Sequence, residues 1–153
     1  MTARIEVRIQ TEDFDLSAEV SALLSGLRDT GAVVTFSGLC RSEDGALAAL
    51  ELEHYPCMAE AEIRRIADEA AGRWPVTALC AIHRVGRIAP GGNIVLVIAA
   101  SAHRQAAFDA ASFLMDFLKS RAPFWKKEHL RHGSEGGWVD AKESDEEALR
   151  RWS

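Results

Sequence analysis

The sequence predicts a single α+β domain, residues 1–153, with a largely antiparallel sheet. The chain is long enough for one domain with a real core, and its 48% hydrophobic and 27% charged residues are typical of globular proteins. Stretches with strand and helix periodicity both occur, but they do not alternate strictly as they do in a parallel α/β fold. The turn sequence Pro90-Gly91-Gly92 joins two of the strands directly.

In the first half of the chain, residues 5–9 alternate between apolar and polar side chains, which is typical of an edge strand. Apolar side chains then recur at helical spacing up to Leu27, and Gly31 follows at a natural stop. The predicted elements are, in order, the edge strand, a helix capped by Asp15 or Ser17, a buried strand over 32–37 that ends at Gly38, a polar loop over 41–46 and a strand over 47–55.

In the second half, two longer stretches carry apolar residues on one face of a helix. The first begins after Pro56 and ends at Pro75, and the second includes Phe108 and Met115 on its apolar stripe. The predicted elements after Pro75 are strands over 77–88 and 93–101, a helix over 104–119, a basic and aromatic segment over 122–132, a hairpin loop over 133–137, a short strand at Trp138 and Val139, and a helix over 144–152 capped by Ser144.

Charge and cysteine content exclude several classes of protein. The net charge of −5 argues against a general nucleic-acid-binding protein. The chain has three cysteines, an odd number, and none of them form a CxxC pair, so neither a disulfide framework nor a zinc site is expected. The N-terminus lacks the apolar stretch of a signal peptide, and no apolar stretch could span a membrane. We therefore expect a soluble, cytoplasmic protein that binds neither nucleic acid nor a membrane.

One segment of this acidic chain is basic. Cations beside the planar rings of Phe124 and Trp125 suit a flat heterocycle that carries phosphate. The alternative is a solvated basic face next to two core aromatics. The cations of this segment are Arg104, Lys119, Arg121, Lys126, Lys127 and Arg131, and the opposing acids are Asp109, Asp116 and Glu128.

Lys119 and Lys126 are the candidate catalytic residues. A lysine among aromatic rings and other cations gives up its proton more readily, so it can act as a general acid–base or as a nucleophile. Lys119 could instead be an ordinary helix-terminal lysine that interacts with the helix dipole. Cys40 fits an inert buried thiol better than a reactive thiolate, and His83 fits a structural role better than a catalytic one.

Two other places could bind an anion. His103 and Arg104 open a helix, where free N–H groups and the dipole attract negative charge. In the alternative, Ser101 only caps that helix and Arg104 is solvated. Arg41 begins a loop after a strand end, a common location for sites, although a loop arginine is often just solvated.

Several motifs occur in one order along the chain. They are GAVVTFSG followed by Arg41, LELEHYP, IHRVG, SAHR at 101–104, FLKSRAPFWKKE and WVDAKESD. Together they resemble the catalytic, or large, subunit of molybdopterin synthase, over nearly everything from Gly31 to Trp152. The SAHR motif and the run from Lys119 to Glu128 are the most specific, and the first thirty residues match only in outline.

The resemblance implies an α/β hammerhead fold and a sulfurtransferase of molybdenum cofactor biosynthesis. Such an enzyme converts cyclic pyranopterin monophosphate to molybdopterin, with sulfur from a thiocarboxylate on the C-terminal Gly-Gly of a small ubiquitin-like carrier subunit. The resemblance also implies a homodimer that binds one carrier at each end, giving a heterotetramer. It implies no metal and no other cofactor for the sulfur transfer.

Residue by residue, the resemblance implies an essential catalytic Lys119 and a second pocket lysine at Lys126. The substrate-binding residues that it implies are Arg41, His103 and Arg104 around the pterin and phosphate, with Lys127 and Glu128 adjoining. Two departures affect the pocket: Leu39 stands where some relatives have lysine, and the loop after Arg41 is short. The rival hypotheses are a non-catalytic phosphate- or nucleotide-binding regulatory module and a scaffold subunit without activity.

Overall fold

The computed structural model describes residues 2–131, 135–139 and 143–152, which form two four-stranded sheets and four helices. The first sheet has the order β1 (Arg4–Gln10), β4 (Val76–Arg84), β6 (Asn93–Ser101), β2 (Ala32–Leu39). The second has the order β5 (Gly86–Ile88), β3 (Leu47–His54), β7 (Phe124–Leu130), β8 (Glu135–Val139). Among these pairs β1–β4 is parallel and the others are antiparallel, so the predicted α+β fold is confirmed.

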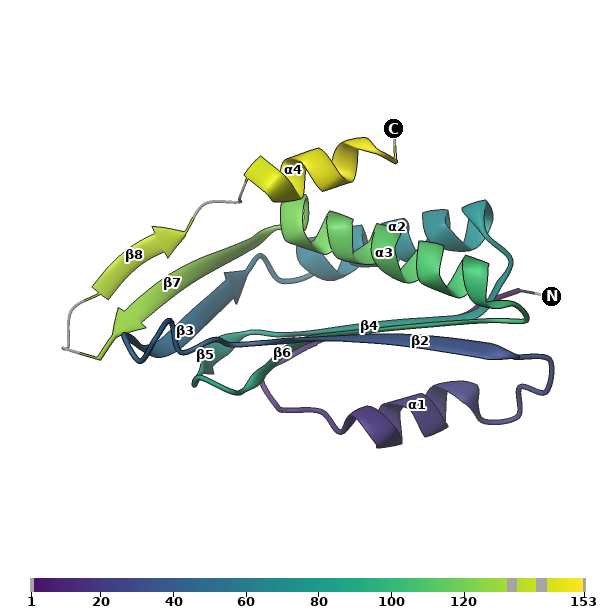
Figure 1. Cartoon of the computed structure of the whole chain (residues 1–153), viewed down its shortest axis with the longest axis horizontal. Helices are drawn as coiled ribbons and strands as arrows, with labels where there is room; N and C mark the ends of the chain where they lie inside the picture. The colour runs from purple at the N-terminus through teal and green to yellow at the C-terminus, as the bar shows by residue number, and fades with distance from the viewer. Residues whose placement is uncertain (1, 132–134, 140–142, 153) are drawn as a thin grey trace.

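Helices cover both faces of the first sheet (Figure 1). The helices α2 (Met58–Arg73) and α3 (Arg104–Ser120) lie on one face, and α1 (Leu16–Leu24) lies on the other. The larger core cluster fills the space under α2 and α3, and a smaller one fills the space under α1. Because both faces are covered, β4 and β6 are almost continuously apolar instead of alternating.

The second sheet lies beyond one end of the first, beside the end of α3 (Figure 1). Sequence periodicity predicted one strand over 77–88, but the structure divides it into β4 and β5, which belong to different sheets. The division falls at Gly86, whose φ of +91° few other residues adopt. This glycine turns the chain from one sheet into the other, and the turn at 90–92 then leads back into β6.

The prediction of a buried strand over 32–37 was wrong about burial. β2 is an edge strand of the first sheet, and Val33, Phe36 and Leu39 are exposed along it. Phe108 on α3 is also exposed, at 56%, although its spacing placed it on the apolar stripe. Apolar residues therefore remain exposed along β2 and on α3.

The basic and aromatic tail had no predicted secondary structure, but most of it forms β7, the strand that pairs with both β3 and β8. The predicted loop over 133–137 was wrong for its second part, because β8 begins at Glu135 and pairs antiparallel with β7, while residues 133 and 134 lie outside the described residues. The last helix, α4 (Glu143–Arg150), begins one residue before its predicted cap, Ser144. It lies against α3 (Figure 1), and no helix in the described part of the chain is long and apolar enough to cross a membrane.

Candidate functional site

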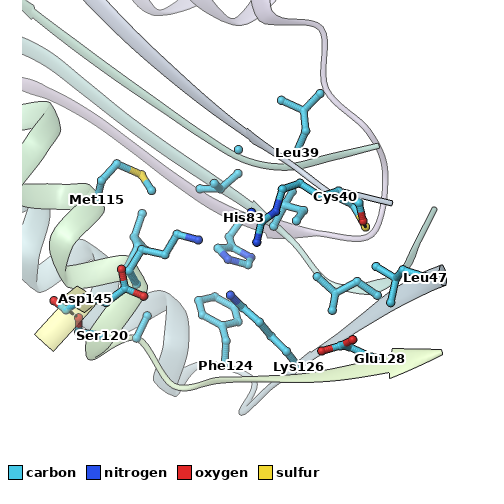
Figure 2. A pocket seen from close by; sticks show the side chains of 18 of the residues that line it. Leu39, Cys40, Leu47, His83, Met115, Ser120, Phe124, Lys126, Glu128 and Asp145 are labelled. Atoms are coloured by element: carbon cyan, nitrogen blue, oxygen red, sulfur yellow. Dashed lines mark hydrogen bonds between the residues drawn. The ribbon is translucent and has the colours of Figure 1, made fainter. Parts of the chain in front are cut away.

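A cavity of about 430 Å³ lies where the two sheets meet the C-terminal end of α3. Figure 2 shows that its walls come from several elements distant in sequence. The end of β2 and the following loop form one side, β7 forms another, and α3 with the start of α4 forms a third. Its volume lies in the range of ordinary small-molecule sites.

Lys119 reaches the cavity because it lies in the last turn of α3, where its charge also suits the helix dipole. Lys126 reaches it from β7. Successive side chains of a strand point to opposite faces, so Lys126 and Glu128 line the cavity while Lys127 lies on the other face, beside Glu51. The hydrogen bond with His129 is the main reason that the pKa of Glu51 is lowered, and the charge of Lys127 adds to this effect. The fold thus brings together two lysines that the chain presents on a helix and a strand.

Arg41 completes the cationic lining from the loop between β2 and β3. Its side chain is 73% exposed, and it forms an ion pair of 3.4 Å with Glu43. Glu43 and Asp44 have positive φ angles of 52° and 56°, which mark a tight turn in the short loop. Leu39 also lines the cavity and is exposed, so an apolar side chain stands at this edge.

His83 and Phe124 form the floor (Figure 2). Their rings stack with centroids 3.9 Å apart and an angle of 13° between the planes. His83 is only 6% exposed, and burial lowers its pKa to about 4, an effect that the nearby charges of Lys126 and Lys119 increase. The imidazole is therefore neutral at physiological pH and adds no positive charge to the cavity.

Helix α4 closes one side of the cavity. Asp145 lines it, and the Ser120 hydroxyl donates a 2.8 Å hydrogen bond to the Asp145 carbonyl oxygen. Arg121, next in sequence, forms a 3.0 Å ion pair with Glu146. These contacts fix the start of α4 against the end of α3, directly beside Lys119.

Three residues proposed from the sequence lie elsewhere. His103 and Arg104 are exposed at the opposite end of α3 from Lys119, and Lys127 is absent from the cavity lining. The separation of the two helix ends is about 22 Å, since fifteen residues rise by 1.5 Å each. Within one copy of the chain, His103 and Arg104 therefore cannot contact a small molecule that Lys119 holds.

Several lining residues were not predicted as site residues. His83 belongs to the IHRVG motif, which was a signal available from the sequence, but it was assigned a structural role. Met115 was assigned to the apolar stripe and instead lines the cavity at the edge of that stripe. Asp145 ends the WVDAKESD motif but was assigned no role, because its place depends on how α4 folds back onto α3.

The other singled-out residues fit structural roles. Cys40 lines the cavity but is buried, and desolvation raises the pKa of its thiol, so it is an inert part of the lining. Trp125 lies on the outer face of β7 and packs edge-on against Tyr55, with centroids 4.4 Å apart. Among the described residues, no group of three or more His, Cys, Asp or Glu side chains is arranged to hold a metal ion.

This arrangement is suited to binding an anionic ligand with a flat ring. Lys119, Lys126 and Arg41 supply cations, Phe124 and the neutral His83 supply a planar floor, and Glu128 supplies a hydrogen-bond acceptor. A partly enclosed cavity also weakens competition from water, which strengthens each of these interactions.

Comparison with known proteins gives consistent results. The family model described as MoaE protein matches residues 9–121. The chain is 71% identical to the molybdopterin synthase catalytic subunit of Mesorhizobium japonicum, over 95% of this chain and 92% of that protein. The structure resembles the molybdopterin biosynthesis MoaE protein of Burkholderia ambifaria with a TM-score of 0.83 and 48% identity, covering 97% of each chain.

The same fold occurs in a protein–protein complex of subunits 1 and 2 of the molybdopterin-converting factor from Helicobacter pylori. There the TM-score is 0.70 and the identity 19%, over 91% of this chain and 90% of that one. At this identity the likeness concerns the fold alone.

Proposed function

Because this chain belongs to the MoaE protein family, we propose that it is the catalytic subunit of molybdopterin synthase and converts cyclic pyranopterin monophosphate to molybdopterin. The observation that carries this proposal is the convergence of Lys119 and Lys126, from α3 and β7, in one cavity with an aromatic floor. The enzyme is a sulfurtransferase of molybdenum cofactor biosynthesis, and its site is this cavity.

Each lining residue has a role that follows from its chemistry. Lys119 is the principal catalytic group and acts as a general acid–base or nucleophile at the reacting carbon. Lys126 is the second catalytic lysine, and its ammonium offsets negative charge on the reactants. Arg41 holds the phosphate from the open edge, and Glu128 accepts hydrogen bonds from the pterin.

The sulfur donor in this proposal is the thiocarboxylate of a small ubiquitin-like carrier subunit that ends in Gly-Gly. Its tail lies extended in a channel bordered by the segment 122–130 and ends beside Lys119. Glycines suit such a channel because they have no side chains to exclude. The Helicobacter pylori structure is a complex of two different subunits, which is the kind of assembly proposed here.

A homodimer of this chain completes the assembly, with one carrier at each end to give a heterotetramer. The exposed apolar edge of β2, which includes Val33 and Phe36, supports a twofold contact there. An antiparallel contact across the middle of β2 brings the start of one β2 near the end of the other. The Gly31 N–H donates a hydrogen bond to the carbonyl oxygen of Ser101. Because α3 begins three residues after Ser101, the start of α3 lies beside the start of β2.

In that dimer His103 and Arg104 of one protomer lie near the cavity of its partner, at the Leu39 edge. They bind the pterin and phosphate across the interface, and Lys127 supports the site from the outer face of β7. We also propose a cytoplasmic location, which the three free cysteines support because thiols stay reduced in the cytosol.

Reconstitution tests the proposed function. The purified chain is mixed with a thiocarboxylated carrier and cyclic pyranopterin monophosphate, and molybdopterin is assayed after oxidation to a fluorescent product. We expect product with the wild-type chain and with Arg64→Ala, which removes an exposed cation of α2 outside the cavity lining. Lys119→Ala should yield none while retaining its fold. Binding of the pterin without turnover by the wild-type chain would instead favour a regulatory binding module.

A further inference from the structure

The neutral histidine on the floor of the cavity has a fixed orientation. His83 Nδ1 lies 2.8 Å from the backbone carbonyl oxygen of Arg84. A carbonyl oxygen only accepts hydrogen bonds, so Nδ1 must be the nitrogen that carries the hydrogen. The ring cannot rotate freely either, because one of its faces stacks on Phe124 at 3.9 Å.

These constraints define the chemistry of the other ring nitrogen. In a neutral imidazole with hydrogen on Nδ1, Nε2 carries a lone pair and can only accept. Nε2 lies at the edge of the ring farthest from the β4 backbone, and that edge faces the cavity (Figure 2). Burial lowers the pKa of His83 to about 4, so the lone pair persists across the physiological pH range.

Two lysine side chains extend into the cavity that this lone pair faces. Lys126 reaches in from β7 with its amino end pointing toward the two rings (Figure 2), and Lys119 reaches in from α3. Both charges act on His83, and His54 on β3 adds a weaker effect. The other charged groups that line the cavity are Arg41, Glu43, Glu128 and Asp145.

We propose that His83 is a positioning residue: its Nε2 accepts a hydrogen bond from the ammonium of Lys126 and orients that ammonium toward the reactants. A group that resists protonation as strongly as His83 is too weak a base to take the lysine proton. The hydrogen bond therefore keeps Lys126 charged and in place. This role rests on the proposed function, but its geometry is testable without any activity.

The first test uses the wild-type protein. In ¹⁵N-histidine NMR spectra, His83 should show hydrogen on Nδ1, none on Nε2, and no protonation between pH 5.5 and 9, a range that begins about 1.5 units above its lowered pKa of about 4. A ring that protonates near its ordinary value, or that carries its hydrogen on Nε2, would overturn the proposal. This result stands whether or not the chain makes molybdopterin.

The second test compares two substitutions. His83→Asn keeps a donor for the Arg84 carbonyl but has no atom at the Nε2 position, whereas His83→Gln can place its amide oxygen there. We expect His83→Asn to lower kcat roughly ten- to hundredfold, the effect of losing a hydrogen bond to a charged group. Carrier affinity should not change, and His83→Gln should recover much of the rate.

The pH dependence separates positioning from a merely structural role. Without the acceptor, Lys126 loses its proton at lower pH, so the basic limb of the kcat profile of His83→Asn should move down by about one pH unit. A folded His83→Asn enzyme with the wild-type rate and the wild-type basic limb would refute the proposal. If His83→Asn does not fold, the His83→Gln profile and the wild-type spectrum decide it.

Discussion

The proposed sharing of the active site between two protomers can be tested by complementation of inactive chains. Lys119 ends α3 and Arg104 begins it, about 22 Å apart along the helix. A cavity of 430 Å³ is only about 9 Å across if it is roughly spherical. One copy of α3 therefore cannot supply both residues to one bound pterin.

The experiment uses purified heterodimers made from two differently tagged chains. One heterodimer pairs Lys119→Ala with Arg104→Ala, and the other pairs the wild-type chain with the double variant. If the site is shared, the first heterodimer has one intact site of two and should show about half of the wild-type molybdopterin formation. The second has a defect in both sites and should be inactive at limiting pterin.

The expected results are reversed if Lys119 and Arg104 of one chain act in the same site. In that case the single-variant pair is inactive and the pair with the wild-type chain retains about half of the activity. That outcome, with heterodimer composition confirmed by mass spectrometry, would refute the twofold arrangement across β2. The comparison is internally controlled because both heterodimers contain the same two substitutions.

Three further predictions follow from the cavity and one from the core. Lys126→Ala should reduce molybdopterin formation severely but less completely than Lys119→Ala; a folded Lys126→Ala enzyme at the wild-type rate would remove Lys126 from the mechanism. Arg41→Ala should weaken pterin binding roughly ten- to hundredfold by calorimetry, the value of a charge-assisted contact, with a smaller effect on the chemical step; unchanged affinity would place the phosphate elsewhere. A carrier extended by one residue beyond its Gly-Gly should bind but fail to deliver sulfur, and full activity with it would contradict the channel. Leu114→Ala should lower the free energy of unfolding by about 2–5 kcal/mol, because Leu114 lies on the buried face of α3 and is completely buried, and denaturant titration measures this loss; a loss below about 1 kcal/mol would contradict tight packing of the core around Leu114.

Local physical chemistry made much of the fold predictable. Asp15 caps α1 as expected, with its carboxylate accepting a hydrogen bond from the Ala18 N–H. The apolar spacing after Pro56 gives α2, and residues on its apolar face, such as Ile63 and Ala70, are buried as the periodicity predicted. These features depend on neighbours within a few residues, so periodicity and capping rules describe them well.

Burial and sheet pairing were harder to predict, because they depend on contacts between distant segments. β2 has the composition of a core strand, yet it lies at a sheet edge with Phe36 41% exposed. β7 follows Pro123 in a segment of charged and aromatic residues, and becomes a strand because β3 and β8 supply its hydrogen-bonding partners.

The sequence by itself determined the chemical types at the site: two lysines, an arginine and aromatic rings in motifs that indicate an anionic heterocycle. It did not determine which of them meet. Tertiary structure brought Lys119, Lys126, Arg41 and Glu128 into one cavity and left His103 and Arg104 at the far end of α3. It also placed His83, for which the sequence predicted a structural role, on the floor of that cavity as a neutral imidazole. The physical reason is that side-chain chemistry is local, whereas the position, burial and charge state of a group depend on every element that packs around it.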